Sequence, residues 1–369
     1  MGYSPDQLLM LDDWSDLSRI RPLPEIDWPA LDSYRKARLR QELTKAGAAL
    51  MILVSPVSIR YAVNYAGYQL FQAHIPTFYL FLPADGPVVL FNTYGKESTA
   101  DEVRQGRPNS FFDGGFDLAL EVIDGVALSE AARFIKGPEE IACMRWAIAV
   151  AEHGIAKVKE MLTPGVSELQ LWGLLNYANL ANNGGWHDGR MLASGPRINP
   201  WLQEASPRRI ERGDLVGFDT DMIGPWGYFA DISRTLFCSP GKPTKRQKEV
   251  YRLAVEEVEY NLGLIRPGLT FGEIQAQAFD VPEEFRAHAY PCILHGVGLC
   301  DEYPYLRPGF RGAPVYDGVI EEGTTLCVES FMGSDTGEPV GVKIEQQVLV
   351  TSEGVERLSS YPYEEILLD

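Results

Sequence analysis

The sequence lacks the features that mark secreted, membrane-bound and nucleic-acid-binding proteins. Its first residues show neither the basic stretch nor the apolar core of a signal peptide, and no apolar run approaches the roughly 20 residues of a membrane span. The five cysteines are odd in number and show no paired CxxC spacing, which is typical of reduced thiols. The net charge of −18 argues against nucleic acid or an anionic membrane as a partner. We therefore expect a cytoplasmic protein.

The length and composition predict a globular protein with more than one domain. The chain has 369 residues, of which 45% are hydrophobic. Residues 30–135 alternate helical and strand patterns, including a helix over 33–46 and strands over 49–54, 77–82 and 88–91. A Lys-Gly-Pro boundary follows at 136–138. We predict an α/β (α+β) fold with a small N-terminal domain, 1–135, and a larger C-terminal domain, 136–369.

The larger domain contains an internal repeat. A helix that starts at Pro138 ends at Thr-Pro-Gly, 163–165, and Ser167 is placed to cap the next helix. A helix over 247–265 ends likewise at Arg-Pro-Gly, 266–268. The segment 211–219 then resembles 321–329, and each is followed by a strand with one acidic residue. The order of features predicts two halves related by a pseudo-twofold axis.

Acidic residues occupy matching places in the two halves. Residues 215–237 read as two strands joined by a turn at 224–227, so alternation places Asp219 and Asp221 on one face and the turn returns Asp231 beside them. The alignment of the halves adds Glu329 and Glu345. Carboxylates this close repel one another unless cations lie among them, although acids near turns can also be simple caps. Five oxygen ligands suit two divalent cations.

One histidine is a candidate ligand beside these acids. His295 lies in a glycine-flanked strand, Leu-His-Gly-Val-Gly-Leu, between the two acidic pairs. An imidazole ligand favours a transition metal, such as iron, manganese, cobalt or zinc. The other four histidines, His74, His153, His187 and His288, lie in helical or loop contexts.

These motifs together resemble the pita-bread metalloenzymes, the superfamily of methionine aminopeptidase, aminopeptidase P, prolidase and creatinase. The similarity covers nearly the whole chain, including a creatinase-like N-terminal domain. It implies a homodimer with a dinuclear metal site.

The chain departs from the peptidase pattern at two histidines and at one aspartate. Peptidases of this superfamily carry a second histidine in an HGxGLxxHE pattern, whereas this chain has Asp301 and Glu302 near that place. An upstream histidine is also missing, and Trp201 lies near its position. Position 220, eleven before Asp231, is Thr220 rather than the usual aspartate. A peptidase is therefore disfavoured.

The Asp-Thr-Asp hairpin and the HGVGLCDE run resemble the DddP-type dimethylsulfoniopropionate lyases, a branch of the same superfamily. The resemblance implies two metal ions, usually assigned as iron, and a base at Asp301 that assists β-elimination. It implies as metal ligands Asp219, Asp221, Asp231, His295, Glu329 and Glu345. A sulfonium substrate needs an aromatic surface, for which Trp201, Tyr228 and Tyr303 are candidates, although all three also suit core packing.

Three functions follow from these observations. The first is a C–S lyase acting on dimethylsulfoniopropionate, a small molecule, without nucleic acid or membrane. The second is an Xaa-Pro peptidase or a C–N hydrolase similar to creatinase or ectoine hydrolase. The third is a binding module without metal, which the complete ligand set disfavours.

Overall fold

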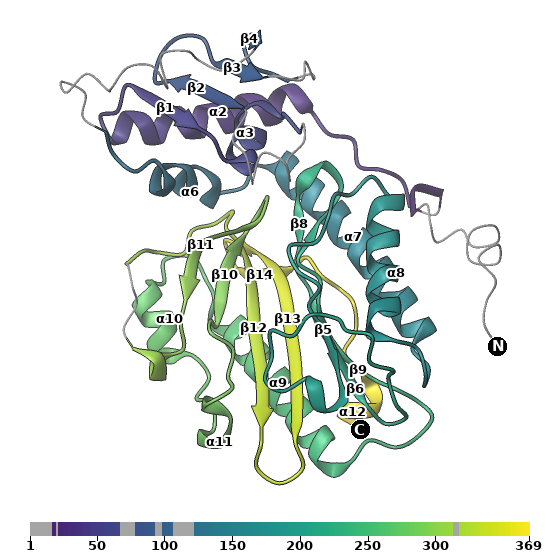
Figure 1. Cartoon of the computed structure of the whole chain (residues 1–369). Helices are drawn as coiled ribbons and strands as arrows, with labels where there is room; N and C mark the ends of the chain where they lie inside the picture. The colour runs from purple at the N-terminus through teal and green to yellow at the C-terminus, as the bar shows by residue number, and fades with distance from the viewer. Residues whose placement is uncertain (1–16, 20, 67–77, 93–97, 106–121, 313–316) are drawn as a thin grey trace. The chain divides into compact units, whose positions relative to one another are not determined.

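The computed structural model describes residues 17–19, 21–66, 78–92, 98–105, 122–312 and 317–369. They divide into two compact units (Figure 1). The smaller unit is Ile26–Glu139, and the larger comprises Glu140–Asp369 with the described part of the first 25 residues. The predicted division at residue 135 stays a proposal. His74 and the start of the strand predicted over 77–82 lie outside the described residues.

The smaller unit has a four-stranded sheet in the order β1-β2-β3-β4, with helices beside it (Figure 1). Strands β2 and β3 pair antiparallel, as predicted for a hairpin, whereas β3 and β4 are parallel. The first helix begins five residues before the predicted start because Asp27 caps it, accepting a hydrogen bond from the backbone of Ala30. The elements are α2 (Trp28–Lys45), β1 (Leu50–Leu53), α3 (Pro56–Val63), β2 (Tyr79–Pro83), β3 (Val89–Asn92), β4 (Glu102–Gln105) and α6 (Val126–Phe134).

The helices of the larger unit follow the predicted pattern. Ser167 caps the second of them in a reciprocal capping box with Gln170, and Thr270 forms the equivalent box with Glu273 in the second half. The α-helices are α7 (Pro138–Met161), which starts in the smaller unit, α8 (Glu168–Ala181), α9 (Lys245–Leu264), α10 (Phe271–Gln277), α11 (Glu283–Arg286) and α12 (Glu365–Leu368). The short 3-10 turns are η2 (Leu17–Arg19), η3 (Gly195–Arg197), η4 (Pro225–Gly227) and η5 (Gly309–Arg311).

The strands of the larger unit form three sheets, ordered β5-β6-β9, β7-β8 and β11-β10-β12-β13-β14. The segment 215–237, predicted as two strands, contains four because the chain leaves the first ladder after Asp219 and re-enters it at Ser233. The strands are β5 (Leu192–Ser194), β6 (Leu215–Asp219), β7 (Met222–Ile223), β8 (Phe229–Ala230), β9 (Ser233–Phe237), β10 (Leu294–Val297), β11 (Asp301–Leu306), β12 (Thr325–Ser334), β13 (Val340–Thr351) and β14 (Gly354–Arg357).

The two longest strands have different faces. One face of β12 and β13 packs against α9 through apolar residues such as Val328, Val342 and Ile344. In Figure 1 this helix lies behind the two strands. The opposite face carries Glu329 and Glu345, which lie directly across from each other in the ladder. Because successive side chains alternate across a strand, one sheet supports both an apolar core and a polar site. The predicted mixed α/β fold is confirmed.

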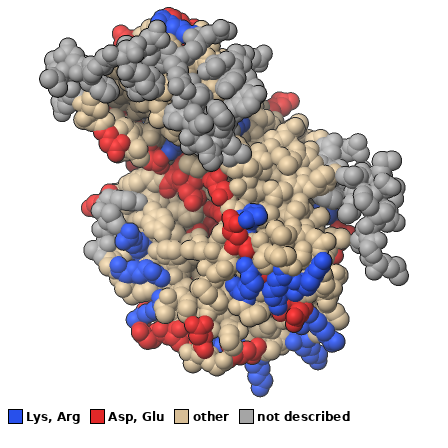
Figure 2. Space-filling model, in the orientation of Figure 1, with Lys and Arg blue, Asp and Glu red and all other residues tan. Residues whose placement is uncertain are grey.

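No described helix combines the length and the apolar character needed to cross a membrane. Basic and acidic side chains occur side by side over the lower part of the larger unit in Figure 2, rather than as a basic surface of one sign. Four of the five cysteines are buried free thiols, and Cys300 is partly exposed.

Candidate metal centre

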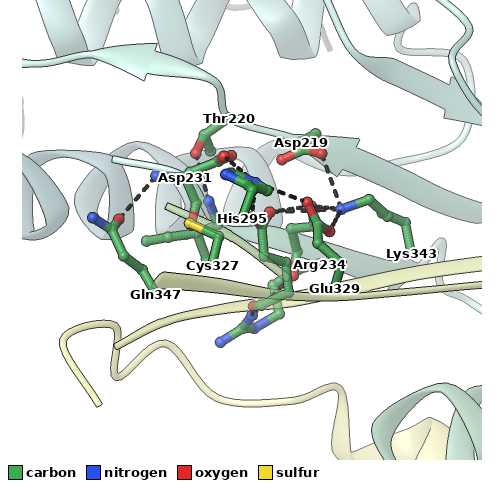
Figure 3. Close-up of polar contacts among 12 residues, drawn as sticks. Asp219, Thr220, Asp231, Arg234, His295, Cys327, Glu329, Lys343 and Gln347 are labelled. Carbon is green, nitrogen blue, oxygen red and sulfur yellow. Dashed lines mark hydrogen bonds and ion pairs between the residues drawn. The ribbon is translucent and has the colours of Figure 1, made fainter. Parts of the chain in front are cut away.

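The six residues expected as ligands come together in the larger unit. Figure 3 labels Asp219, Asp231, His295 and Glu329 among them. They converge because β6, β10, β12 and β13 each present one of them, while the remaining two lie in the connections that join β6 to β9. Within each of three overlapping groups, one ligand atom per residue lies within 4.8 Å of the others. The groups are Asp231, His295, Cys327 and Glu345; Asp219, Glu329 and Glu345; and Asp219, Asp221 and Asp231.

The His295 ring is oriented by its own backbone. Its Nδ1 atom lies 2.9 Å from the carbonyl oxygen of Gly296, a contact that favours the proton on Nδ1. The Nε2 atom then faces the acids, at 3.2 Å from Glu329 Oε1, 3.5 Å from Asp231 Oδ2 and 3.7 Å from Glu345 Oε1. This is the arrangement of a metal-binding imidazole, with one nitrogen held by the protein and the other directed at the site.

The Asp-Thr-Asp segment directs both aspartates to the cluster, although the two residues do not lie on one regular strand. The strand β6 ends at Asp219, and Asp221 adopts a left-handed backbone conformation with φ 35°. Between them the Thr220 hydroxyl turns away, donating to the carbonyl of Ala230 at 2.8 Å and accepting from the amide of Ile232 at 3.0 Å. Both aspartates therefore reach the cluster, but through a bend rather than the predicted common strand face.

Three carboxylates of the cluster have a buried oxygen that no described protein group satisfies. These atoms are Asp219 Oδ1, Asp231 Oδ1 and Glu345 Oε1. An unpaired carboxylate oxygen away from water is costly unless a cation binds it. The unpaired atoms belong to the predicted ligand set and occur beside the imidazole, so the residues fit a site for hard or borderline divalent cations.

The acids of the cluster raise one another's pKa. Burial and the neighbouring acids hold the pKa values of Asp221 and Asp231 well above their usual range. Burial also raises the pKa of Asp219, although Lys343 opposes the rise. Burial lowers the pKa of His295, but the acids around it outweigh this effect and leave its pKa raised. A metal ion would reverse the preference of these acids for protons, because ligands bind metal in their ionised form.

Two residues of the cluster escaped sequence analysis. Lys343 is fully buried, with Nζ 2.5 Å from Glu329 Oε2 and 3.0 Å from Asp219 Oδ2 (Figure 3). Cys327 lies in one metal-compatible group, but burial keeps its thiol pKa well above the usual range, and the thiol donates to the carbonyl of Asp231 at 3.8 Å. Each lies two positions before a predicted ligand on the same strand, so strand alternation was the signal that could have found both.

Asp301, the expected base, is the first residue of β11. Its side chain is 64% exposed, and Oδ1 lies 3.5 Å from His295 Nδ1. The adjacent Glu302 is buried and accepts a hydrogen bond from the amide of Leu299 at 3.1 Å, which gives it a structural contact. Asp301 is thus an accessible carboxylate at the edge of the cluster.

Trp201 lies on the face of the sheet that carries the acids. Its ring stacks on Phe331 with centroids 5.6 Å apart, and Phe331 is two positions from Glu329 on β12. A Cβ atom on Gly217, two positions before Asp219, would come within 3.2 Å of the indole. The indole nitrogen is buried without a hydrogen-bond partner among the described residues.

The other two aromatic candidates make contacts elsewhere. The hydroxyl of Tyr228 donates to Glu140 Oε1 at 3.0 Å, and the side chain is fully buried. Tyr303 packs edge-to-face on Phe271 of α10, with ring centroids 5.5 Å apart. Neither contact involves the acidic cluster, and the substrate-binding role of both residues stays a prediction.

Comparison with known proteins places this arrangement in a family. The model of metallopeptidase family M24 matches residues 142–352. The chain is 31% identical to "Dimethylsulfoniopropionate lyase DddP" of Roseobacter denitrificans over 395 residues, covering 93% of this chain and 88% of the relative. The "Dimethylsulfoniopropionate lyase DddP" of Roseovarius nubinhibens is also 31% identical, over 98% of this chain and 92% of its own length.

Peptidases are similar over a shorter span in sequence and over most of the chain in structure. The "Xaa-Pro dipeptidase" of Pyrococcus furiosus is 31% identical over 62% of this chain and 63% of its own length. The solved structure of an Xaa-Pro dipeptidase from Bacillus anthracis superposes with a TM-score of 0.74 at 24% identity, covering 90% of this chain and 99% of that one. The metal-compatible cluster, the pita-bread fold and the family match agree, and the chain belongs to metallopeptidase family M24.

Proposed function

We propose that this protein is a metal-dependent lyase that cleaves the C–S bond of dimethylsulfoniopropionate to dimethyl sulfide and acrylate. The observation that carries the proposal is the length of the similarity to the two lyases, which spans 93% and 98% of this chain. The Pyrococcus dipeptidase, by contrast, matches 62% of it at the same identity. Similarity that includes the N-terminal region supports a shared function more strongly than similarity of the metal-binding half alone.

The proposed ligands divide between the two halves of the repeat. They are Asp219, Asp221, Asp231, His295, Glu329 and Glu345, and they would hold two divalent ions, with iron as the proposed metal and manganese, cobalt or zinc as alternatives. When bound, such ions withdraw electron density from a substrate carboxylate and make its α-proton more acidic. The three unpaired carboxylate oxygens support this assignment.

We assign Asp301 as the general base. Its carboxylate is exposed enough to meet a substrate, and its Oδ1 atom is 3.5 Å from His295, so it lies beside the proposed metal ligands. Asp301 takes the α-proton, the electrons of that C–H bond form the new carbon–carbon double bond, and the β-carbon–sulfur bond breaks. Dimethyl sulfide leaves with the electron pair of the broken bond, and acrylate remains.

Trp201 stacks on Phe331 on the same sheet face as Glu329, and both rings are buried beside the cluster; we propose the Trp201 ring as the aromatic group that meets the substrate. Aromatic faces attract cations without demanding hydrogen bonds, which suits a sulfonium group that has no donor. Trp201 also stands near the place where peptidases of the superfamily carry a histidine. In this chain a tryptophan thus stands in place of a histidine that handles protons, and we propose that it provides a surface for a methylated cation.

An M24 hydrolase is the second candidate. The family match and the structural likeness to dipeptidases favour it at the level of fold. Against it, the position of the second peptidase histidine is filled by Asp301 and Glu302, and neither can act as a neutral imidazole does. Hydrolysis of a peptide or amide would therefore need a different proton donor for its leaving amine.

Headspace gas chromatography for dimethyl sulfide tests the proposal. The purified protein is loaded anaerobically with iron or manganese and given dimethylsulfoniopropionate, and acrylate is measured in parallel. We expect both products, with loss of both after chelation or in His295→Ala. His288→Ala is the matched control, because His288 pairs with Asp335 in an exposed contact. No dimethyl sulfide from metal-loaded protein, together with release of proline from Xaa-Pro dipeptides, would replace the lyase by the hydrolase.

The remaining proposals concern assembly, location and partners. We propose a homodimer from the family resemblance, a cytoplasmic location from the cysteine pattern and composition, and a small-molecule substrate without nucleic acid or membrane as partner. Size-exclusion chromatography with light scattering tests the first of these directly.

A further inference from the structure

Lys343 is a fully buried lysine, an arrangement that is stable only when the ammonium group is paired and hydrogen-bonded. It lies on β13 two positions before Glu345, so both side chains point to the sheet face that carries the cluster. The Tyr290 ring lies 4.4 Å from its Nζ atom and adds a cation–π contact on the remaining side. The acidic cluster therefore contains a buried lysine as part of the protein itself.

The hydrogen-bond geometry around this side chain matches its charged form. Nζ lies 2.5 Å from Glu329 Oε2, 2.6 Å from Ser233 Oγ and 3.0 Å from Asp219 Oδ2. The Ser233 hydroxyl has one hydrogen, which it donates to Glu345 Oε2 at 2.8 Å, so its oxygen accepts from the lysine. Three acceptors around one nitrogen match the three hydrogens of an ammonium group.

Lys343 divides the oxygens of the carboxylates into two sets. It contacts Asp219 Oδ2 and Glu329 Oε2, and Glu345 Oε2 lies 3.6 Å away. The other oxygen of each carboxylate is left for the metal centre. Asp219 Oδ1 and Glu345 Oε1 have no hydrogen-bond partner among the described groups, and Glu329 Oε1 faces His295 Nε2. These three acids form one of the metal-compatible groups, so the ammonium orients the carboxylates that would bind metal.

The net charge of the cluster also favours two metal ions that each carry two positive charges. The cluster contains five carboxylates and one lysine. Two divalent cations would balance the five ligand carboxylates and Lys343 to zero, whereas the same ions would leave a centre without Lys343 one unit negative. Asp301 is left out of this sum because its carboxylate is exposed to solvent. A trivalent ion in either position would give an excess positive charge in a buried site, which is costly.

We propose that Lys343 is a positioning residue that orients Asp219 and Glu329 and sets the charge of the centre, so that it accepts two divalent ions and disfavours trivalent ones. The inference rests on the two-ion centre of the proposed function, but it does not depend on the reaction catalysed. Its observable consequence is the oxidation state of bound iron, because loss of a nearby positive charge favours Fe(III) over Fe(II).

The test is an anaerobic redox titration of the iron-loaded protein. We expect Lys343→Met and Lys343→Gln to raise the Fe(III) to Fe(II) ratio at a fixed potential at least tenfold, a fall of the midpoint potential by 59 mV or more for one electron. Lys343→Arg keeps the charge and should stay near the wild-type potential. Lys159→Met is the surface control, since Lys159 pairs with Glu364 away from the cluster.

Stoichiometry and folding distinguish the possible failures. Circular dichroism and Mn(II) binding are measured on each variant, and a wild-type protein that does not take up two Mn(II) would contradict the proposed centre itself. Folded neutral variants with the wild-type potential would overturn the role of Lys343. If the neutral variants do not fold, metal uptake by the wild-type protein decides. We expect the wild-type protein to bind two Mn(II) ions and to exclude Ga(III), a trivalent ion that is redox-inert. Equal uptake of two Ga(III) ions would overturn the inference.

Discussion

At the scale of single residues, the centre depends on how each side chain divides its polar atoms between protein and cation. His295 gives Nδ1 to a backbone carbonyl and keeps Nε2 for the cluster, and Glu345 gives Oε2 to Ser233 and keeps Oε1. Such divided contacts fix the orientation of a ligand before metal binds and reduce the entropy lost on binding.

Asp301→Asn tests the assignment of the base. The asparagine is nearly isosteric but cannot accept the α-proton, so we expect lyase turnover to fall by roughly 10²- to 10⁴-fold. Metal content, measured by inductively coupled plasma mass spectrometry, should be unchanged because the side chain is outside the proposed ligand set. Asp280→Asn serves as the control, since Asp280 is an exposed acid paired with Arg286. Full activity in Asp301→Asn would assign the base elsewhere.

The sequence predicted the members of the cluster better than their contacts. Motif comparison and the repeat identified six residues that the structure brings together. Alternation along a strand failed for Asp221, because the left-handed backbone at that residue is a property of the bend and not of the pattern. Alternation along β13 places Lys343 on the same face as Glu345, but an isolated lysine has no motif, and its contacts with Asp219, Glu329 and Ser233 depend on the folded chain.

At the scale of secondary structure, helix ends were predictable because their signals are local. The Pro-Gly stops and the cap at Ser167 occur where the sequence placed them, and the structure adds the equivalent cap at Thr270. The division of residues 215–237 into four strands was not predictable, since it depends on Thr220 bonding to the neighbouring strand. Packing of α9 against β12 likewise joins residues that are distant in the sequence.

This packing contains a buried acid whose titration affects stability. Glu257 on α9 lies 2.5 Å from Ser330 Oγ on β12, and burial raises its pKa to about 8. The folded protein therefore keeps a proton that the unfolded chain, with a pKa near 4.5, releases. Its contribution to the free energy of unfolding consequently falls as the pH rises from about 4.5 to 8.

Glu257→Gln should remove this pH dependence, because glutamine resembles the protonated acid. We expect the variant to match wild type near pH 5 and to exceed it in stability near pH 8, by on the order of 3 kcal/mol. Thermal unfolding at the two pH values measures the difference. Glu256→Gln changes an exposed neighbour on the same helix and should show no such trend. A constant difference between Glu257→Gln and wild type across this range would contradict a buried neutral carboxyl.

The loop before β6, which contains Ile198 and Trp201, packs against β13 at Gly341, where a larger side chain would collide with it. A Cβ atom at Gly341 would approach Ile198 Cγ2 to 2.9 Å and the Ile198 carbonyl to 3.0 Å. Gly341→Ala should therefore displace the loop that carries Trp201, with a loss of about 1–3 kcal/mol in stability. We also expect a higher KM for the proposed sulfonium substrate, with metal content retained. Gly263→Ala, in an open position on α9, is the control. An unchanged KM would separate the loop from substrate binding.

At the scale of the whole molecule, metal binding and folding stability are linked. The raised pKa values of Asp219, Asp221 and Asp231 mean that the metal-free folded protein retains protons which the unfolded chain releases. Stability of the metal-free protein should thus decline as the pH rises above the unfolded value of 3.8. Bound divalent ions remove this penalty by holding the same groups ionised, so their stabilising effect should increase with pH.

Chelation therefore tests the centre without any assay of activity. With free Mn(II) fixed at about 100 times the Kd that each site has at pH 5.5, the loaded protein should be more stable than the chelated protein at that pH by about 3 kcal/mol per bound ion. The difference between their unfolding midpoints should be larger at pH 8 than at pH 5.5, because fewer protons compete for the ligands. Glu257 contributes equally to both forms, so it cancels from this difference. A midpoint difference that stays constant between the two pH values would mean that the buried acids do not exchange protons for metal, and the proposed ligand set would have to be revised.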